Sequence, residues 1–240
     1  MTQHLETASG VVIVLQPEGV EIPAGIRTLA EFRAWACSDP FPERGRIDWV
    51  RGRMEVDLAP EDINTHGSPK SAMAVRLGVL VQESRRGMVF IDRTRLSCAG
   101  ADLSAEPDVL VLLVETLRSG RARLIPRASG EPGRYLEIEG TADLVVECVS
   151  DSSTGKDKRQ LREAYQAAGV TEYWLVDARR SPVQFDLLHL QEGRYVSSPV
   201  DAEGYRHSPF LRLEVRLARD EEAAGLVFFR LDVRTDSPRP

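Results

Sequence analysis

Residues 141–177 read as a strand, a turn, a helix and a second strand. The first strand, Leu144–Val149, is apolar apart from Glu147, and the Ser-rich turn after it offers several N-cap residues for the helix. The helix ends before Gly169, a residue that suits the left-handed position beyond a helix end. The second strand covers Glu172–Val176. This succession predicts an α/β centre.

A second apolar run, Asp108–Val114, has the length of a strand and begins with an acid. Its continuous apolar character fits a strand covered on both faces. Hairpins are predicted on either side of this centre, at Arg46–Asp57 around an Arg-Gly turn and at residues 183–197. We therefore expect an α/β fold with a mixed sheet flanked by helices, antiparallel at the start and end of the chain.

Apolar spacing predicts two more helices before this centre. One covers residues 28–36 with Thr28 as its N-cap, and the other begins at Pro69 and continues to about Arg86, before a short strand at residues 88–92. The expected organisation is an N-terminal arm or edge strand at 1–27, one domain at 28–234 with a basic insertion at 118–134, and a frayed tail at 235–240.

The bulk composition narrows the class of protein. A chain of 240 residues suits one domain, and its net charge of −6 does not indicate a strongly basic nucleic-acid binder, although a local basic patch can exist on an acidic protein. No apolar run approaches the length of a membrane span, and the N-terminus lacks the pattern of a secretory signal. Three widely spaced cysteines favour the reducing cytoplasm.

Several common catalytic and metal motifs are absent from the sequence. There is no G-x-S-x-G, no Walker A loop and no G-x-G-x-x-G. The four histidines lack ligand spacing, which argues against zinc, and a lone loop histidine such as His66 is expected at the surface.

Asp108 and Glu147 are the candidate site residues, because each is an acid at the end of an apolar strand. Carboxylates held at strand ends suit a divalent cation, which prefers oxygen ligands. The alternative is that both are solvated strand-end residues. Lys156 or Lys158, near the start of the following helix, could orient a water or neutralise developing negative charge. The alternative for either lysine is a solvated helix terminus.

Several of these stretches resemble the Uma2 family, a group described as restriction endonucleases within the PD-(D/E)xK nuclease superfamily. The matching residues are Pro107-Asp108-Val109-x-Val111, Asp143-Leu144-Val145-Val146-Glu147-x-Val149-Ser150-x-Ser152, Asp157, Tyr165, Ala168-Gly169-Val170 and Glu172-Tyr173-Trp174-Leu175-Val176-Asp177. The resemblance extends more weakly to the hairpin at residues 46–57, to the His66 loop and to the helix after it.

The resemblance implies a restriction-endonuclease-like fold and a role for each matching acid. Asp108 and Glu147 would bind the metal, Mg²⁺ or Mn²⁺, and Asp48 would support it. The superfamily lysine falls at Val149 here, so Lys156 or Lys158 would replace it.

The resemblance implies a metal-dependent endonuclease that hydrolyses phosphodiester bonds, with DNA as the expected partner and a homodimer as an allowed assembly. One alternative is a catalytically silent module of the same fold that binds nucleic acid or protein. Another is a regulatory partner that uses the arginines of residues 118–134 as its contact surface, and the same arginines could instead contact phosphate.

Overall fold

The computed structural model describes the backbone of residues 2–7, 10–15, 19–127, 130–151 and 155–235, and their side chains except at 2–15, 155–158 and 221. The helices in this part of the chain are α1 (Leu29–Ala36), the π-helical turn η1 (Ile63–Gly67), α2 (Ser68–Gln82), the 3₁₀ turn η2 (Ala99–Ala101), α3 (Val114–Arg118) and α4 (Gly155–Ala167).

The central sheet has the strand order β15-β14-β13-β12-β9-β6. Its strands are β6 (Gly87–Ile91), β9 (Val109–Leu113), β12 (Leu144–Cys148), β13 (Glu172–Asp177), β14 (Gln184–Gln191) and β15 (Arg194–Ser197). β12 and β13 are parallel and are connected through α4, whereas the other neighbours in this sheet are antiparallel. The sheet is therefore mixed, as the sequence predicts.

A second six-stranded sheet has the order β10-β11-β7-β8-β4-β5. Its strands are β4 (Arg46–Val50), β5 (Arg53–Asp57), β7 (Arg95–Cys98), β8 (Leu103–Ala105), β10 (Ala122–Pro126) and β11 (Tyr135–Gly140). The predicted hairpin is β4–β5, and its turn residues Arg51 and Gly52 have φ of 51° and 80°. Positive φ at both positions is the geometry of a type I′ turn, which is favoured in two-residue hairpin loops. Residues 118–134 contain β10, which pairs with β11.

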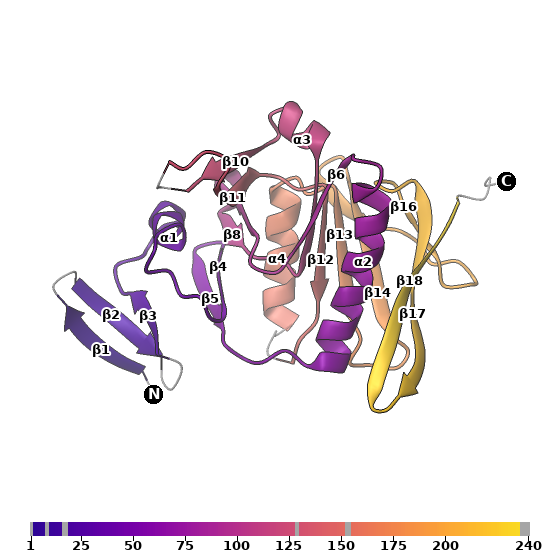
Figure 1. Ribbon diagram of the computed structural model, residues 1–240, viewed down its shortest axis with the longest axis horizontal. Coiled ribbons are helices and arrows are strands. Elements are labelled where there is room, and N and C mark those ends of the chain that lie inside the picture. The colour runs from indigo at the N-terminus through magenta and orange to yellow at the C-terminus, as the bar shows by residue number, and fades with distance from the viewer. Residues whose placement is uncertain (1, 8–9, 16–18, 128–129, 152–154, 236–240) are drawn as a thin grey trace.

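Two three-stranded antiparallel sheets lie at opposite ends of the molecule (Figure 1). The first contains β1 (Thr2–Thr7), β2 (Gly10–Leu15) and β3 (Val20–Pro23). The second contains β16 (Arg206–Ser208), β17 (Leu213–Ala223) and β18 (Leu226–Thr235). Figure 1 shows the long β17–β18 hairpin beside α2. Of the tail predicted to fray, Thr235 ends β18, and residues 236–240 lie outside the described part of the chain.

The central sheet is covered on both faces, which explains its continuous apolar strands. Alternate side chains of β9 point to opposite faces: Leu110 lies in a core shared with α4 and the second sheet, and Val109 lies in a core shared with α2 and β17–β18. β12 alternates in the same way, with Val145 in the first core and Val146 in the second. The covering elements confirm the interpretation of these apolar runs.

A third core positions α1 against β4. Phe32 and Trp35 of α1 pack with Trp49 of β4 and with residues of β3. The helix begins where the sequence predicts, because the Thr28 side chain accepts a hydrogen bond from the Glu31 N–H while the Glu31 carboxylate accepts one from the Thr28 N–H. This packing fixes the position of β4, the strand that carries Arg46 and Asp48. Within the described residues, no helix is long and apolar enough to cross a membrane.

Candidate active site

Asp108 and Glu147 lie side by side because of the register between two strands. Val109 of β9 pairs with Val146 of antiparallel β12, so the residue before one strand lies next to the residue near the end of the other. The Cys148 N–H donates a 2.7 Å hydrogen bond to Asp108 Oδ2 across this pair. Both carboxylates are buried. The structure thus brings together the two acids that the sequence analysis selected, and it does not place them as solvated strand-end residues.

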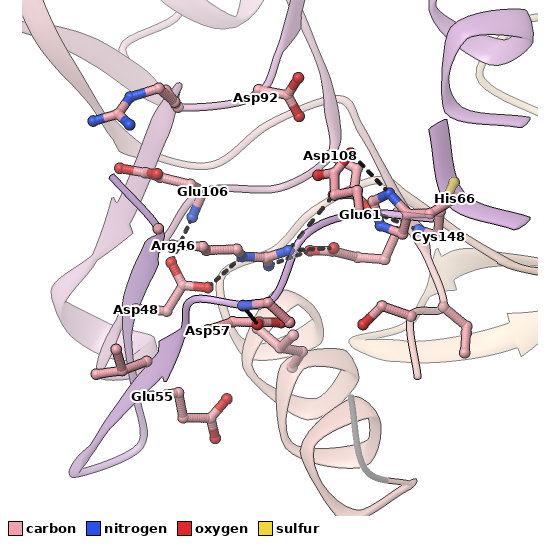
Figure 2. Close-up of a pocket in the computed structure, with 18 of the residues that line it drawn as sticks. Arg46, Asp48, Glu55, Asp57, Glu61, His66, Asp92, Glu106, Asp108 and Cys148 are labelled. Atoms are coloured by element: carbon pink, nitrogen blue, oxygen red, sulfur yellow. Dashed lines mark hydrogen bonds and ion pairs between the residues drawn. The ribbon is translucent and has the colours of Figure 1, made fainter. Parts of the chain in front are cut away.

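Arg46 enters this pair from the second sheet. Its Nη1 lies 3.2 Å from Glu147 Oε2 and 3.6 Å from Asp108 Oδ1, and its Nη2 lies 3.2 Å from Glu147 Oε1. Its Nε donates a 2.7 Å hydrogen bond to Asp48, which faces the same side of β4 two residues later. Figure 2 shows the guanidinium beside Asp48 and reaching toward Asp108. Three carboxylates therefore share one guanidinium.

Asp48 is buried and is itself held in place. Its Oδ1 accepts a 2.9 Å hydrogen bond from the Glu106 N–H, while its Oδ2 accepts the bond from Arg46. Asp48 therefore contacts Arg46, and Arg46 contacts Asp108 and Glu147. The structure places all three predicted acids in one cluster.

Tyr165 of α4 completes the surroundings of Glu147. Its hydroxyl donates a 2.7 Å hydrogen bond to Glu147 Oε1. Burial raises the pKa of Glu147 to about 7, with a further contribution from the negative charge of Asp108, and this outweighs the opposing effects of Arg46 and Tyr165. Burial also acts to raise the pKa of Asp108, but the hydrogen bond with His66 and the charge of Arg46 prevail and lower it.

His66 is buried, which corrects the expectation of a surface histidine. The turn η1 places it against Asp108, with Nε2 3.3 Å from Asp108 Oδ2 and Nδ1 3.1 Å from Glu61 Oε2. The Nδ1 atom has no well-oriented hydrogen bond within the described part of the chain. Burial disfavours the charged ring, but the hydrogen bond and charge of Asp108 outweigh it and raise the pKa of His66.

Glu61 and Lys70 extend the site away from β12. Ligand atoms of Glu61, His66 and Asp108 lie within 4.8 Å of one another, close enough to share a metal ion. Lys70, near the start of α2, places Nζ 2.6 Å from Glu61 Oε2 and 2.8 Å from Asp92 Oδ1. The pKa of Lys70 is raised, since these two acids outweigh the effect of its burial.

For the two candidate lysines, the structure describes the backbone but not the side chain. Lys156 and Lys158 belong to the first turn of α4, but their side chains lie outside the described part of the structure. Val149, at the position of the superfamily lysine, is buried.

A cavity of about 550 Å³ opens onto this cluster. Its lining combines the site acids with residues of the β5 strand and of the loop after it; the charged members are Arg46, Asp48, Glu55, Asp57, Glu61, Asp92, Arg93, Glu106, Asp108 and Glu147. Figure 2 shows several of these side chains facing one another. The cavity gives a solute access to carboxylates that are otherwise buried.

Sequence reasoning missed Arg46, Glu61, Lys70 and the role of Tyr165. One signal was available for Arg46, because residues two apart on a strand share a face and Arg46 lies two residues before Asp48. Nothing in the spacing of Glu61 or Lys70 indicates that Glu61 lies beside His66 or that Lys70 pairs with Glu61.

The arginines of residues 118–134 are largely paired with acids. Arg121, Arg123, Arg127 and Arg134 lie within ion-pair distance of Asp143, Glu139, Asp39 and Glu131, respectively. These pairs reduce the free positive charge that the segment offers to a phosphate.

The chain matches the model of one protein family, and its fold is similar to that of a solved structure. A family model described as "Uma2: Putative restriction endonuclease" matches residues 29–220. The structure is similar to the crystal structure of a putative nuclease belonging to DUF820 from Anabaena variabilis, with a TM-score of 0.53 and 18% sequence identity over 74% of this chain and 90% of that one. No curated protein shows a significant sequence match.

Proposed function

Because the chain belongs to the Uma2 family, we propose that it is a metal-dependent endonuclease that hydrolyses phosphodiester bonds in DNA. The observation that carries the proposal is the convergence of Asp108 and Glu147, two buried carboxylates, beside a cavity. The family description supports a nuclease, and the choice of DNA follows from its word "restriction".

The residues present fit a divalent cation. One oxygen of Asp108 and one of Glu147 face the same point, and a cationic nitrogen of Arg46 stands there. These are hard oxygen donors of the kind that Mg²⁺ and Mn²⁺ prefer. The charged residues that line the cavity are mostly acids, and a divalent cation would balance part of their negative charge.

In the proposed mechanism, Asp108 and Glu147 would hold Mg²⁺ or Mn²⁺. A cation in such a site activates water and stabilises charge on a phosphodiester. Asp48 supports the site through Arg46, and Tyr165 orients Glu147 by its hydrogen bond. His66 orients Asp108 through Oδ2, whereas Arg46 contacts Oδ1. We assign the positioning of the attacking water to Lys156 or Lys158.

The test is cleavage of supercoiled plasmid with Mg²⁺ or Mn²⁺ by wild type, Glu147→Gln and Glu163→Gln. Glu163 is the matched control, because it is an exposed acid on α4 that pairs with Arg51, outside the site. We expect wild type and Glu163→Gln to nick or linearise the plasmid and Glu147→Gln to lose at least about a hundredfold in rate, since even indirect metal partners typically contribute 10- to 100-fold. Equal cleavage by Glu147→Gln would reject this site.

A second candidate function is a catalytically silent module on the same fold. The observation that favours it is the buried Val149 at the position of the superfamily lysine. Folded wild-type protein that cleaves no plasmid and gives no heat on titration with Mn²⁺ would support this alternative over the endonuclease.

A further inference from the structure

We propose that Arg46 is an internal cation that occupies the metal position and is displaced when a divalent cation binds. This inference rests on the proposed function, because it takes Asp108 and Glu147 as the metal ligands. It assigns to Arg46 control over the affinity of the site for metal.

The first argument is which oxygen atoms Arg46 contacts. Asp108 Oδ2 is engaged by the Cys148 N–H at 2.7 Å and by His66 at 3.3 Å. Glu147 Oε1 is engaged by the Tyr165 hydroxyl at 2.7 Å and also by Arg46 Nη2 at 3.2 Å. The other two oxygens, Asp108 Oδ1 and Glu147 Oε2, have Arg46 Nη1 as their partner among the described residues. These are the oxygens left to a metal, so metal and guanidinium compete for the same atoms.

The second argument is the unequal hold of the three acids on the guanidinium. The contact with Asp48 is 2.7 Å, within the range of strong charge-assisted hydrogen bonds. The two contacts with Glu147 are each 3.2 Å, and the contact with Asp108 is 3.6 Å. Arg46 is therefore held most closely by Asp48 of its own strand, and its contacts with the two metal ligands are longer. Release from the two ligands leaves the stronger contact with Asp48 intact.

The third argument is that a bound divalent cation would repel the Arg46 guanidinium, and that the Arg46 side chain has space to move. Mg²⁺ binds oxygen at about 2.0–2.1 Å, so it must take the space where Nη1 lies and would repel a guanidinium left there. About 29% of the Arg46 side chain is already exposed, and Arg46 lines the cavity. The side chain can turn toward the cavity without breaking the packing of the core.

The experiment measures Mn²⁺ binding by isothermal titration calorimetry, without DNA, for wild type, Arg46→Gln, Arg46→Lys and Arg53→Gln. Arg53 is the matched control, an exposed arginine on the adjacent strand of the same hairpin. We expect Arg46→Gln to bind Mn²⁺ at least about tenfold more tightly than wild type, because no cation has to leave. Arg46→Lys should be intermediate, since an ammonium cannot span two carboxylates as a planar fork does. Arg53→Gln should match wild type.

Each outcome decides the inference. Affinity of Arg46→Gln equal to or weaker than that of wild type would overturn it, and so would the absence of Mn²⁺ binding in both proteins. If Arg46→Gln does not fold by circular dichroism, Arg46→Lys carries the test, and wild-type affinity in that variant would overturn it. Because DNA is absent, this binding assay is independent of cleavage. If wild type cleaves DNA but Arg46→Gln binds Mn²⁺ with the affinity of wild type, only the displacement of Arg46 is rejected. If Arg46→Gln binds Mn²⁺ more tightly but wild type does not cleave DNA, only the endonuclease proposal is rejected.

Discussion

Glu147 and Glu172 are two buried acids of the same sheet with very different surroundings. The pKa of each is raised to about 7, and burial is the largest cause for both. Glu172 lies at the start of β13. Among the described residues, its hydrogen-bond donors are neutral: the Trp174 indole, the Ser208 hydroxyl and the Phe210 N–H. Glu147 lies near the end of β12, the strand parallel to β13, beside Asp108, Arg46 and a cavity.

The comparison teaches that a raised pKa does not identify a functional site. Glu172 fastens the segment before β17 to the central sheet, and its hydrogen-bonding capacity is used within the protein. Glu147 shares one guanidinium with two other carboxylates, so its region has an excess of negative charge. The distinction lies in the neighbours and not in the burial of the carboxylate.

Replacing Glu172 by alanine should have the largest effect on stability. At about pH 5 the variant should lose about 3 kcal/mol in free energy of unfolding, because buried donors on Trp174, Ser208 and Phe210 would be left without a partner. Glu147→Gln, which keeps an oxygen for the Tyr165 hydroxyl, should change by less than about 1 kcal/mol. Urea unfolding of both variants checks this, and the comparison fails if Glu172→Ala is as stable as wild type.

The pH dependence of stability should carry the signature of Glu172. Its pKa rises from 4.5 in the unfolded chain to about 7 in the fold, so between these values the folded protein holds a proton that the unfolded chain releases. The contribution of Glu172 to the free energy of unfolding is therefore fully present below about pH 4.5. It decreases by about 3 kcal/mol in total as the pH rises to 7. Glu172→Gln cannot titrate, so its stability should fall less than that of wild type between about pH 5 and pH 8.

The measurement is urea unfolding of both proteins at the two pH values. Identical losses in wild type and Glu172→Gln would show that Glu172 has an ordinary pKa in the folded protein.

Tyr165→Phe should have the smallest effect on stability. It tests whether the Tyr165 hydroxyl orients Glu147 or whether the residue only packs in the core. Loss of the hydrogen bond to Glu147 should lower plasmid cleavage about tenfold and raise the Mn²⁺ concentration needed for half-maximal rate. Tyr195→Phe is the matched control, because it removes a buried hydroxyl that donates to the Val170 carbonyl oxygen in the same core. Both variants should lose about 1 kcal/mol of stability, and the same cleavage loss in both would assign Tyr165 a packing role only.

The centre of the fold and two acids of the site could be predicted because they depend on local patterns. Asp108 and Glu147 interrupt or begin apolar runs, and those runs are strands covered on both faces. Glu172 also begins an apolar strand, yet its sequence neighbours do not reveal that Ser208 and Phe210 satisfy it. The same local pattern therefore selects an acid of the cluster and an acid that fastens the fold.

The rest of the site could not be predicted because it depends on how separate sheets pack. Arg46 reaches Glu147 from the second sheet, and no periodicity in either segment specifies that contact. The sequence predicts His66 at the surface, because a single loop residue carries no burial pattern, whereas η1 places it against Asp108. The long hairpin β17–β18 also escaped prediction, although it covers one face of the central sheet.

The antiparallel register of β9 and β12 determines which changes in the length of the chain between them the site can tolerate. The two acids are aligned by the pairing of Val109 with Val146, so their separation in space does not depend on the length of chain that joins them. The turn between β10 and β11 can therefore be lengthened, shortened or cut without altering the geometry of the acids, provided that α3 and both strand ends remain. The connection between β10 and β11 is therefore a place where the protein can be split into two complementing fragments.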